Sequence, residues 1–414
     1  MKNRVVITGM SGVTSLGNNW NEIHENMTQG KTGVRVMDEL KEIKGLNTSL
    51  GAPILNFHLP THYTRKQTRA MGRVAQLATV ATEAALKQAN LLDREDILTG
   101  GKTGIAYGSC SGSTEALCDL TAIKIEKTIK KVTATTYIKS MSHTCAVNLG
   151  IFFGITGRVI PTSSACTSSS QAIGYAYETI KNGYQDVMIA GGAEELCPSQ
   201  VAVFDTLYAT SQKNTEPHLT PKPFDQCRDG LVIGEGSCSL ILEELTHAKA
   251  RNAKIYAEIV GFGTNCDARH VTQPSANTMS RALSLAIKDA NISASYIGYV
   301  SAHGTATEHG DIAESQATNQ ILGSQIPISS LKSYFGHTLG ACGATEAWLS
   351  IHMMNDGVFV PTINLDVIDP NCAALDYIKN DDRNLKCNYI MSNNFAFGGI
   401  NTSLIFKKFR HTAI

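Results

Sequence analysis

Short apolar segments rich in β-branched residues alternate with amphipathic helical segments along the whole chain of 414 residues. The expected strands are 4–10, 103–109, 186–195, 237–244, 255–264, 297–305, 326–333, 388–399 and 402–408. The expected helices are 73–91, 166–182, 278–291, 310–322 and 341–356. Several of the strands are almost continuously apolar, as strands covered on both faces are. This alternation predicts an α/β fold with helices layered on a buried sheet.

A weak internal repeat divides the chain. Segments 168–183 and 342–357 have equal length, begin with small residues, continue as an amphipathic helix and end in Asn-Gly or Asp-Gly. Each is followed by a strand-like stretch with a Gly-Gly pair. No linker rich in Pro, Ser or Gly separates the two parts, so we expect two similar halves, 1–250 and 251–414, packed together.

Composition narrows the functional class. Lys+Arg and Asp+Glu both number 36, so the formal net charge is zero and no overall field attracts nucleic acid. No stretch approaches the roughly 18 apolar residues of a membrane helix, and the N-terminus lacks the pattern of a signal peptide. The 11 cysteines contain no Cys-x-x-Cys pair that would indicate zinc or redox chemistry. We therefore expect a cytoplasmic protein without a membrane span.

Cys166 lies in "PTSSACTSSSQAIG", where small hydroxyl residues lead into a predicted helix. A thiol at this position can be a buried filler, a metal ligand or a nucleophile. The positive end of a helix stabilises a thiolate, and small neighbours leave room for a substrate. Free cysteines are nevertheless often buried and inert, so the segment alone leaves these interpretations open.

Two histidines stand out by their context. His303 follows a strand in "SAHGTAT", and His337 precedes a helix in "LKSYFGHTLGACG". Neutral imidazoles can stabilise an oxyanion or move a proton. Lys332, just before His337, is either an exposed lysine at a strand end or an interior lysine, which requires a partner such as Glu346.

Two further loops carry recognisable patterns. In "NNFAFGGINTS", glycines beside Phe395 and Phe397 indicate a backbone that approaches a ligand closely, the alternative being a plain turn between strands. The loop "KPFDQCRDGLVIGEG" is expected to be structural, held by a charge pair between Asp225 and Arg228.

These five motifs, in this order, resemble the β-ketoacyl–acyl-carrier-protein synthases of the elongating (type II) class. The resemblance covers essentially the whole chain and implies the thiolase-like fold, five αβαβα layers built from two similar halves. Such enzymes bind no metal or cofactor of their own. Their substrates are carried on the phosphopantetheine of acyl carrier protein.

The resemblance implies a role for each motif. Cys166 would accept the acyl group, with its own backbone N–H and that of Phe397 forming the oxyanion hole. Phe397 would also gate the acyl pocket. His303 and His337 would promote decarboxylation of malonyl–carrier protein, and Lys332 would orient them.

Further residues receive supporting roles from the same resemblance. They are Glu346, Asp311 and Glu314 for structural support, Thr305 and Thr307 for the pantetheine arm, Ser111 and Phe204 for the acyl pocket, and Arg65, Lys66, Arg69, Lys124 and Lys127 for docking the carrier protein. Arg65, Arg69 and Arg73 are spaced as one helical stripe. Basic runs are usually solvated faces, but here the resemblance favours docking of an acidic carrier protein. The family also implies a homodimer, or a heterodimer with a chain-length-factor-like homologue.

The sequence departs from the family pattern around the site. Ala396 replaces the first glycine of the closing loop, which we expect to restrict the backbone around Phe397. Tyr208 and Ala70 stand where docking residues are expected, and Ser111 where a bulkier apolar residue often limits the pocket. In addition, Thr307 is followed by Glu-His instead of Pro. These changes favour a specialised synthase of a polyketide or aryl-polyene pathway, with housekeeping fatty-acid elongation as the alternative.

Other classes of thiol enzyme fit less well. A degradative thiolase is expected to carry a second cysteine near the closing Gly-Gly, and a starter-type condensing enzyme has Asn where this chain has His337. A non-catalytic chain-length partner loses the nucleophile that Cys166 supplies. A thioester hydrolase shares the nucleophile and the oxyanion hole, and release of CO2 from malonyl–carrier protein would separate the two.

Overall fold

The computed structural model describes residues 2–410. Its main feature is a mixed sheet with the strand order β12-β10-β9-β14-β15-β8-β1-β7-β6-β4-β5. The first half of the chain supplies β1 (Val5–Thr14), β4 (Thr103–Gly108), β5 (Val159–Thr162), β6 (Val187–Glu194) and β7 (Gly236–Glu244). The second half supplies β8 (Ala257–Cys266), β9 (Ile297–Ser301), β10 (Pro327–Ser329), β12 (Asp376–Tyr377), β14 (Tyr389–Phe395) and β15 (Ile400–Lys408).

Helices cover both faces of this sheet. They are α1 (Trp20–Thr28), α2 (Asp38–Lys41), α3 (Arg65–Thr68), α4 (Arg73–Gln88), α5 (Glu95–Leu98), α6 (Thr114–Ile125), α7 (Thr136–Ser140), α8 (Thr144–Phe153), α9 (Ser168–Lys181), α10 (Pro198–Asp205), α11 (Leu245–Ala250), α12 (Ala276–Ala290), α13 (Glu308–Leu322), α14 (Lys332–Phe335) and α15 (Cys342–Asp356). Short elements complete the chain: strand pairs β2 (Arg35–Val36) with β3 (Leu50–Gly51) and β11 (Val358–Phe359) with β13 (Arg383–Asn384), and 3-10 turns η1 (Pro217–Leu219), η2 (Ala294–Tyr296) and η3 (Leu339–Ala341).

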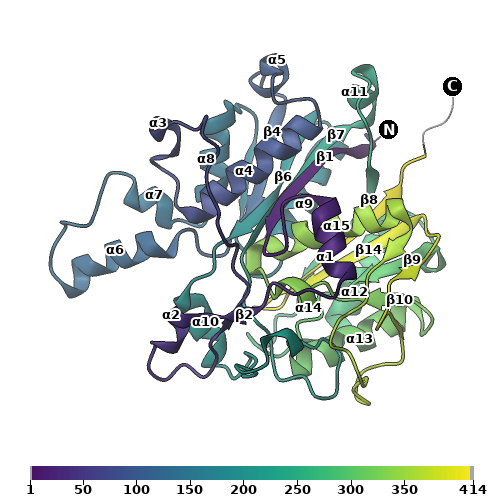
Figure 1. Cartoon of the computed structure of the whole chain (residues 1–414). Coiled ribbons are helices and arrows are strands. Elements are labelled where there is room, and N and C mark those ends of the chain that lie inside the picture. The colour runs from purple at the N-terminus through teal and green to yellow at the C-terminus, as the bar shows by residue number, and fades with distance from the viewer. Residues whose placement is uncertain (1, 411–414) are drawn as a thin grey trace.

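The expected five-layer arrangement is confirmed. Helices α9 and α15 contact each other in the middle layer, and each also contacts strands of both halves (Figure 1). Helices α4 and α8 form the outer layer of the first half, and α12 and α13 that of the second. The two halves have equivalent strand orders, and β1 pairs antiparallel with β8 to join them.

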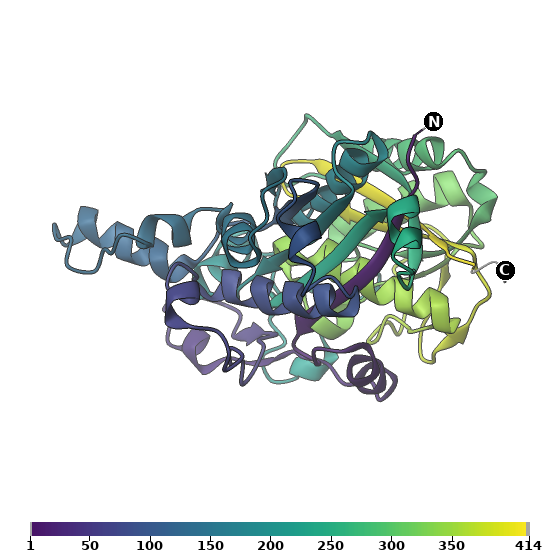
Figure 2. The same ribbon diagram turned by 90° about the horizontal axis from the view of Figure 1, so that it is seen from above.

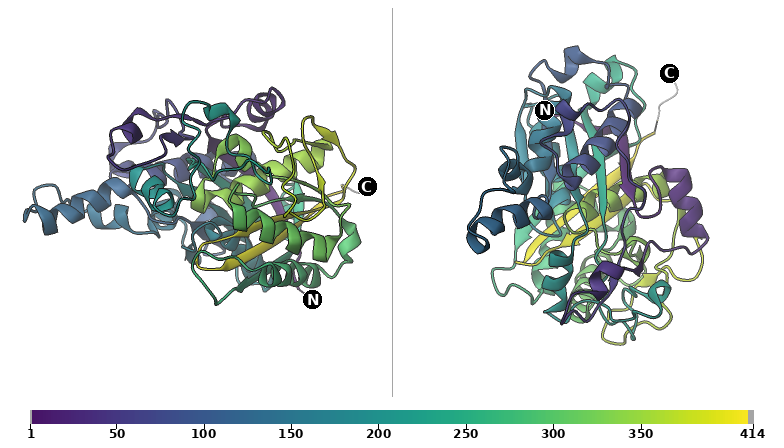
Figure 3. Two further views of the ribbon diagram at one scale, coloured as in Figure 1. Left: turned by 90° about the horizontal axis from the view of Figure 1, so that it is seen from below. Right: turned by 60° about the vertical axis from the view of Figure 1, so that its left-hand side comes forward.

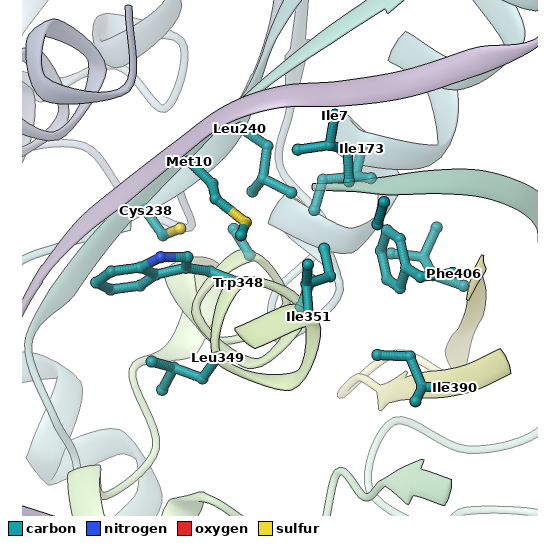
Figure 4. Packing of buried hydrophobic residues seen from close by; sticks show 14 of the residues in the cluster. Ile7, Met10, Ile173, Cys238, Leu240, Trp348, Leu349, Ile351, Ile390 and Phe406 are labelled. Carbon is teal, nitrogen blue, oxygen red and sulfur yellow. The ribbon is translucent and has the colours of Figure 1, made fainter. Parts of the chain in front are cut away.

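The core is built around the middle layer. Trp348 on α15 packs with Met10, Leu240 and Ile351 between the two halves of the sheet, and Figure 4 shows these side chains gathered around α15. Gly12 on β1 lets the ring approach, because a Cβ there would lie 2.6 Å from the Trp348 ring. The close packing fixes α9 and α15, the helices that follow the motifs of Cys166 and His337.

Most expected elements are confirmed, with one informative difference. The strand expected over 326–333 is wrong beyond Ser329, because the chain turns into the short helix α14. Gly336, with a φ of 65°, ends that helix in the left-handed region. Lys332 therefore begins a helix instead of extending a strand, and this turn carries its side chain inward.

One part of the first half stands away from the body. Residues 114–140, here called the arm, comprise α6, a loop and α7, and they project from the layers in two views (Figures 2 and 3). Leu117, Ile123, Ile125, Ile129 and Tyr137 of the arm are exposed, up to 74% for Ile125 and Ile129. Within residues 2–410, no helix has the length and apolar composition needed to cross a membrane.

Candidate active site

Cys166 lies in a tight turn between β5 and α9. Ala165 adopts a left-handed φ of 51°, a strained conformation for a residue with a side chain. Hydroxyl groups hold the turn: Thr167 Oγ1 donates to the Ser164 carbonyl at 2.8 Å, and Ser168 Oγ to the Ala165 carbonyl at 2.7 Å. The row of small hydroxyl residues therefore supports a turn that places the thiol at the base of a cavity.

His337 and His303 both face this thiol. His337 Nε2 lies 2.9 Å from Cys166 Sγ, while its Nδ1 accepts a hydrogen bond from the Leu339 amide at 3.2 Å. His303 Nδ1 lies 3.1 Å from Lys332 Nζ, and an ammonium group can only donate. These partners assign the proton of each neutral ring to Nε2. The site thus presents two N–H donors beside one sulfur.

A buried ion pair holds His303. Lys332 Nζ lies 2.5 Å from Glu346 Oε1, and Asn394 Nδ2 donates to Glu346 Oε2 at 2.7 Å. Lys332 is only 2% exposed, so the interpretation as an exposed lysine is wrong. Burial, and then the charge of Lys332, lower the pKa of His303 well below its usual value; the same causes act on the pKa of His337. Both rings are neutral near pH 7.

Two buried acidic side chains support the loop of His303. Glu314 accepts hydrogen bonds from the amides of His303 and Gly304, each at 2.7 Å, and burial raises its pKa to about 8. Asp311 accepts from the Phe224 amide at 2.7 Å, and burial raises its pKa to about 6. Both acids therefore lie where structural support was expected.

The expected charge pair between Asp225 and Arg228 is wrong. The Arg228 side chain pairs instead with Asp369 at 2.6 Å and Asp311 at 3.5 Å, and reaches only the backbone carbonyl of Asp225. The Asp225 carboxylate accepts from the amides of Asp366 and Val367. The fold brings Asp311 and Asp369 from distant segments to the guanidinium. Asp225, the neighbour in sequence, binds backbone amides instead.

The resting thiol is protonated. Burial raises the pKa of Cys166 to about 11, although the charge of Lys332 and the amides of Phe397 and Cys166 act to lower it. The expectation that a helix end lowers this pKa is wrong, because α9 begins only at Ser168 and desolvation dominates. The two amides aimed at the sulfur are the same pair that was expected to form the oxyanion hole.

A cavity of about 440 Å³ leads to the thiol. The expected site residues that line it are Cys166, Phe204, His303, Thr305, Thr307, Glu314, His337 and Phe397. Thr305 Oγ1 and Thr307 Oγ1 lie 2.9 Å apart on its wall. Leu207, Tyr208 and Val271 line the cavity and are 46%, 83% and 67% exposed, so they form its mouth.

Phe204 and Phe397 close one side of this cavity. Their rings stack with centroids 5.1 Å apart and an interplanar angle of 16°. The turn after β14 takes left-handed φ values at Gly398 and Gly399. Ala396, whose amide donates to the Ile400 carbonyl at 2.8 Å, has no left-handed φ, so its Cβ fits the turn. Ser111, expected in the acyl pocket, is not among the residues that line the cavity; its Oγ accepts a hydrogen bond from Gln200 Nε2 at 3.1 Å.

The basic residues expected to dock a carrier protein are exposed, but they do not form one stripe. Arg65, Lys66 and Arg69 lie at α3, which ends at Thr68. Arg73 begins a different helix and binds Glu235 through two contacts of 2.5 and 2.8 Å. The prediction of one helical stripe through Arg65, Arg69 and Arg73 is wrong because α3 ends after one turn. The remaining pair, Lys124 and Lys127, is exposed on the arm.

Two residues that form hydrogen bonds around the site were not singled out from the sequence. Asn394 binds Glu346 and lies 3.4 Å from His303 Nδ1, and the only signal for it was its place in "NNFAFGG". Glu194 accepts from the amides of Cys110 and Gly340 at 2.7 and 3.2 Å, and burial raises its pKa to about 7. It connects the first half to the turn after His337. No local pattern marked it.

A buried thiol, two N–H donors and an open cavity are the groups that acyl transfer through a cysteine would require. Residues 2–248 match the N-terminal domain of β-ketoacyl synthases, and residues 256–366 match their C-terminal domain. The chain belongs to the β-ketoacyl synthase family. It is a β-ketoacyl–acyl-carrier-protein synthase whose substrates are carried on phosphopantetheine, without a cofactor of its own.

Relatives with known names agree over the full length. The chain is 37% identical to 3-oxoacyl-[acyl-carrier-protein] synthase 2 of Vibrio harveyi, over 98% of this chain and 99% of that protein. A β-ketoacyl synthase from Burkholderia phymatum STM815 superimposes with a TM-score of 0.97 and 55% identity, covering 99% and 100% of the two chains. The ishigamide ketosynthase/chain length factor superimposes with a TM-score of 0.91 and 27% identity, covering 99% and 100%.

Proposed function

We propose that Cys166, His303 and His337 carry out a decarboxylative Claisen condensation. The product is a β-ketoacyl–acyl carrier protein two carbons longer than the acyl group bound to Cys166. The observation that carries this assignment is the pair of Nε2–H donors beside the thiol. Amides of Phe397 and Cys166 supply the separate oxyanion site that acyl transfer requires.

In the first step, Cys166 Sγ attacks the thioester carbonyl of the acyl–carrier protein. The new C–S bond forms as the bond to pantetheine breaks, and the thiol proton ends on the departing pantetheine sulfur. The amides of Phe397 and Cys166 stabilise the tetrahedral oxyanion. Lys332 and the N–H of His337 stabilise the attacking thiolate, which burial otherwise disfavours.

In the second step, the thioester oxygen of malonyl–carrier protein accepts hydrogen bonds from His303 and His337. The carboxylate leaves as CO2, and the electron pair of the broken C–C bond becomes the enolate that these donors stabilise. The enolate carbon attacks the acyl carbonyl on Cys166. The C–S bond breaks and returns the electron pair to sulfur.

Replacement of Cys166 by Gln tests this assignment. The variant loses acyl transfer and condensation, while malonyl decarboxylation by His303 and His337 remains. Purified variant and native enzyme are incubated with malonyl– and acyl–carrier protein, and CO2 and β-ketoacyl product are measured. Condensation retained in the variant would refute the role of Cys166. Free acid without CO2 from the native enzyme would favour a thioester hydrolase.

For the acyl chain, we propose a specialised polyketide or polyene substrate. The departure at Tyr208, which lines the mouth of the cavity, supports it, as does similarity to the ishigamide ketosynthase/chain length factor. Housekeeping fatty-acid elongation is the second candidate, favoured by relatives named 3-oxoacyl-[acyl-carrier-protein] synthase 2 and 1 at 37% and 36% identity. A competition assay that measures turnover of saturated and polyunsaturated acyl–carrier proteins distinguishes the two candidates. Equal or faster use of the saturated chain would overturn the specialised assignment.

The edge strand β5 and the arm support assembly with a second chain of the same fold. β5 ends the sheet and is partly exposed, with Val159 43% exposed, so its outer edge can pair with another strand. The ketosynthase ApeO was solved in complex with its chain length factor ApeC. Measuring the mass of the complex formed when the chain is expressed with its genomic neighbours distinguishes a homodimer from a heterodimer.

A further inference from the structure

Glu194, the last residue of β6, is a fully buried acid to which the condensation steps give no role. Its Oε2 accepts hydrogen bonds from the amides of Cys110 and Gly340 at 2.7 and 3.2 Å. Its Oε1 accepts from Ser109 Oγ and Gln200 Nε2 at 3.3 and 3.4 Å. One oxygen therefore binds the backbone of two segments that are far apart in the chain, one from each half.

Gly340 lies in the turn η3, shortly after His337, and Leu339 between them has an unusual backbone. Leu339 takes a left-handed φ of 46°, which residues with a side chain rarely adopt. In this conformation its amide donates to His337 Nδ1 at 3.2 Å. The Leu339 amide thus decides which ring nitrogen of His337 keeps the proton. A strained φ of this kind persists only where the surrounding structure holds it.

Glu194 and β6 hold the peptide that follows Leu339. A Cβ at Gly340 would lie 2.7 Å from Glu194 Oε2, and a Cβ at Gly192 would lie 2.6 Å from the Gly340 carbonyl oxygen. Glycine at both positions lets the turn lie this close to the end of β6. On its other side, Leu339 is buried in an apolar cluster with Phe204. The turn is therefore fixed by the first half of the chain.

We propose that Glu194 is a positioning residue for His337: it holds the turn so that the Leu339 amide keeps the His337 proton on Nε2. This role rests on the proposed condensation, in which that N–H donates to the enolate oxygen. Lys332 sets the tautomer of His303 from within the second half. Each half of the chain therefore contributes to setting one histidine tautomer.

Loss of the Glu194 carboxylate leaves the Gly340 amide buried without its acceptor. The turn then relaxes toward a backbone that Leu339 favours, and the Leu339 amide moves away from Nδ1. A neutral imidazole without a donor at Nδ1 can carry its proton there, and Nε2 then faces the substrate as an acceptor. An acceptor does not stabilise an oxyanion, so the chemical step slows while substrate binding changes little.

Malonyl decarboxylation in the Cys166→Gln background tests this role, because it uses both histidines and needs no acyl group on sulfur. We expect added Glu194→Ala to slow CO2 release about tenfold or more, since loss of one oxyanion donor has effects of this order. KM for malonyl–carrier protein should stay within about twofold. Glu194→Gln keeps an oxygen for the two amides and should restore most of the rate.

Glu195→Ala, in the same background, is the matched control. Glu195 is 4% exposed, and its carboxylate also accepts from backbone amides, those of Thr114 and Val74 at 2.7 and 3.2 Å. These amides belong to the first turns of α6 and α4 and not to the turn of His337. This variant should lose stability but keep the rate of CO2 release. An equal fall in its rate, or a full rate in folded Glu194→Ala, would overturn the proposal.

The tautomer of His337 gives a readout that does not depend on catalysis. Ring nitrogens with and without a proton differ in chemical shift, so protein labelled with ¹⁵N-histidine reports the tautomer, and His337→Ala identifies the signal. We expect Nε2–H in the native protein and in Glu194→Gln, and a population of Nδ1–H in Glu194→Ala.

The same spectra separate this proposal from the proposed condensation. If Cys166→Gln releases no CO2, the condensation assignment fails, and the tautomer still decides the role of Glu194. If Glu194→Ala does not fold, Glu194→Asp, which is one methylene group shorter, takes its place. A His337 tautomer that is unchanged in the folded variant would overturn the proposal.

Discussion

The buried network around Cys166, here called the thiol layer, and the arm are built in opposite ways. Around the thiol, Lys332, Glu346, Asn394, His303 and His337 are all buried, and each has a hydrogen-bonding partner. On the arm, α6 buries only two alanines, while isoleucines and lysines face solvent.

This difference separates two kinds of work. The thiol layer holds its hydrogen-bond donors in fixed positions before a substrate arrives, and interactions between its charges are strong because water is excluded. The arm contributes little to the core of its own subunit and leaves apolar surface uncovered. We therefore expect substitutions in the layer to act on chemistry, and substitutions on the arm to act on association.

The largest effect is expected where the buried ion pair is broken. Lys332→Met leaves the buried Glu346 without its cation, with only the hydrogen bond from Asn394, and such losses cost about 3–5 kcal/mol of stability. We also expect condensation to fall by about a hundredfold or more, because His303 loses the group that fixes its proton on Nε2. Chemical denaturation and turnover measure the two effects.

The double variant Lys332→Met with Glu346→Gln separates these effects. Removing both charges should recover most of the stability but little of the activity. Recovery of both stability and activity would show that Lys332 acts only through stability. Substitutions in the thiol layer would then not act on chemistry, contrary to our expectation.

The protonated resting thiol predicts a pH dependence. Since burial raises the pKa of Cys166 to about 11, the thiolate fraction rises about tenfold for each pH unit below that value. The rate at which iodoacetamide alkylates Cys166 should therefore rise about tenfold per unit between pH 7 and 10. Mass spectrometry of the labelled peptide measures it, with the exposed Cys118 as an internal reference. A rate that levels off near pH 7 would contradict the prediction.

On the arm, Ile125→Asp combined with Ile129→Asp should prevent association with a second chain. Both side chains are 74% exposed, so the free energy of unfolding of the single subunit should change by less than about 0.5 kcal/mol. Light scattering measures the mass and denaturation the stability. Val367→Asp, at another exposed apolar position, is the control. Loss of the folded subunit would show that the arm belongs to its core.

A smaller effect is expected at the mouth of the cavity. Tyr208→Ala removes an aromatic ring that is 83% exposed beside the route to Cys166. We expect KM for malonyl–carrier protein to rise about threefold with kcat unchanged, as loss of about 0.7 kcal/mol of docking contact would produce. Tyr296→Ala, 62% exposed elsewhere, should leave KM unchanged. An equal rise in KM for malonyl–pantetheine would show that Tyr208 contacts the pantetheine of the substrate and not the carrier protein.

The sequence was sufficient to predict functional residues that a motif marks by residue type and position. Cys166, His303, His337 and the partnership of Lys332 with Glu346 could all be anticipated in this way. Their distances could not, because they depend on how α9 and α15 meet in the middle layer.

The failures share a physical cause. The predicted pairing of Arg228 with Asp225 assumed that neighbours in sequence are neighbours in space, whereas Asp311 and Asp369 arrive from distant segments. The arginine stripe assumed a helix that continues, and α3 ends after one turn. The pKa of Cys166 was misjudged because burial cannot be read from a helix start. Each error concerns a quantity that only tertiary structure sets.

The two ends of the sheet limit how many chains can associate through strand pairing. β12, at one end, is a two-residue strand, while β5, at the other, is longer and open. A chain with a single usable edge joins one partner and then has none left to offer. If association uses the β5 edge as proposed, it stops at a pair, and the chain does not polymerise through its own backbone.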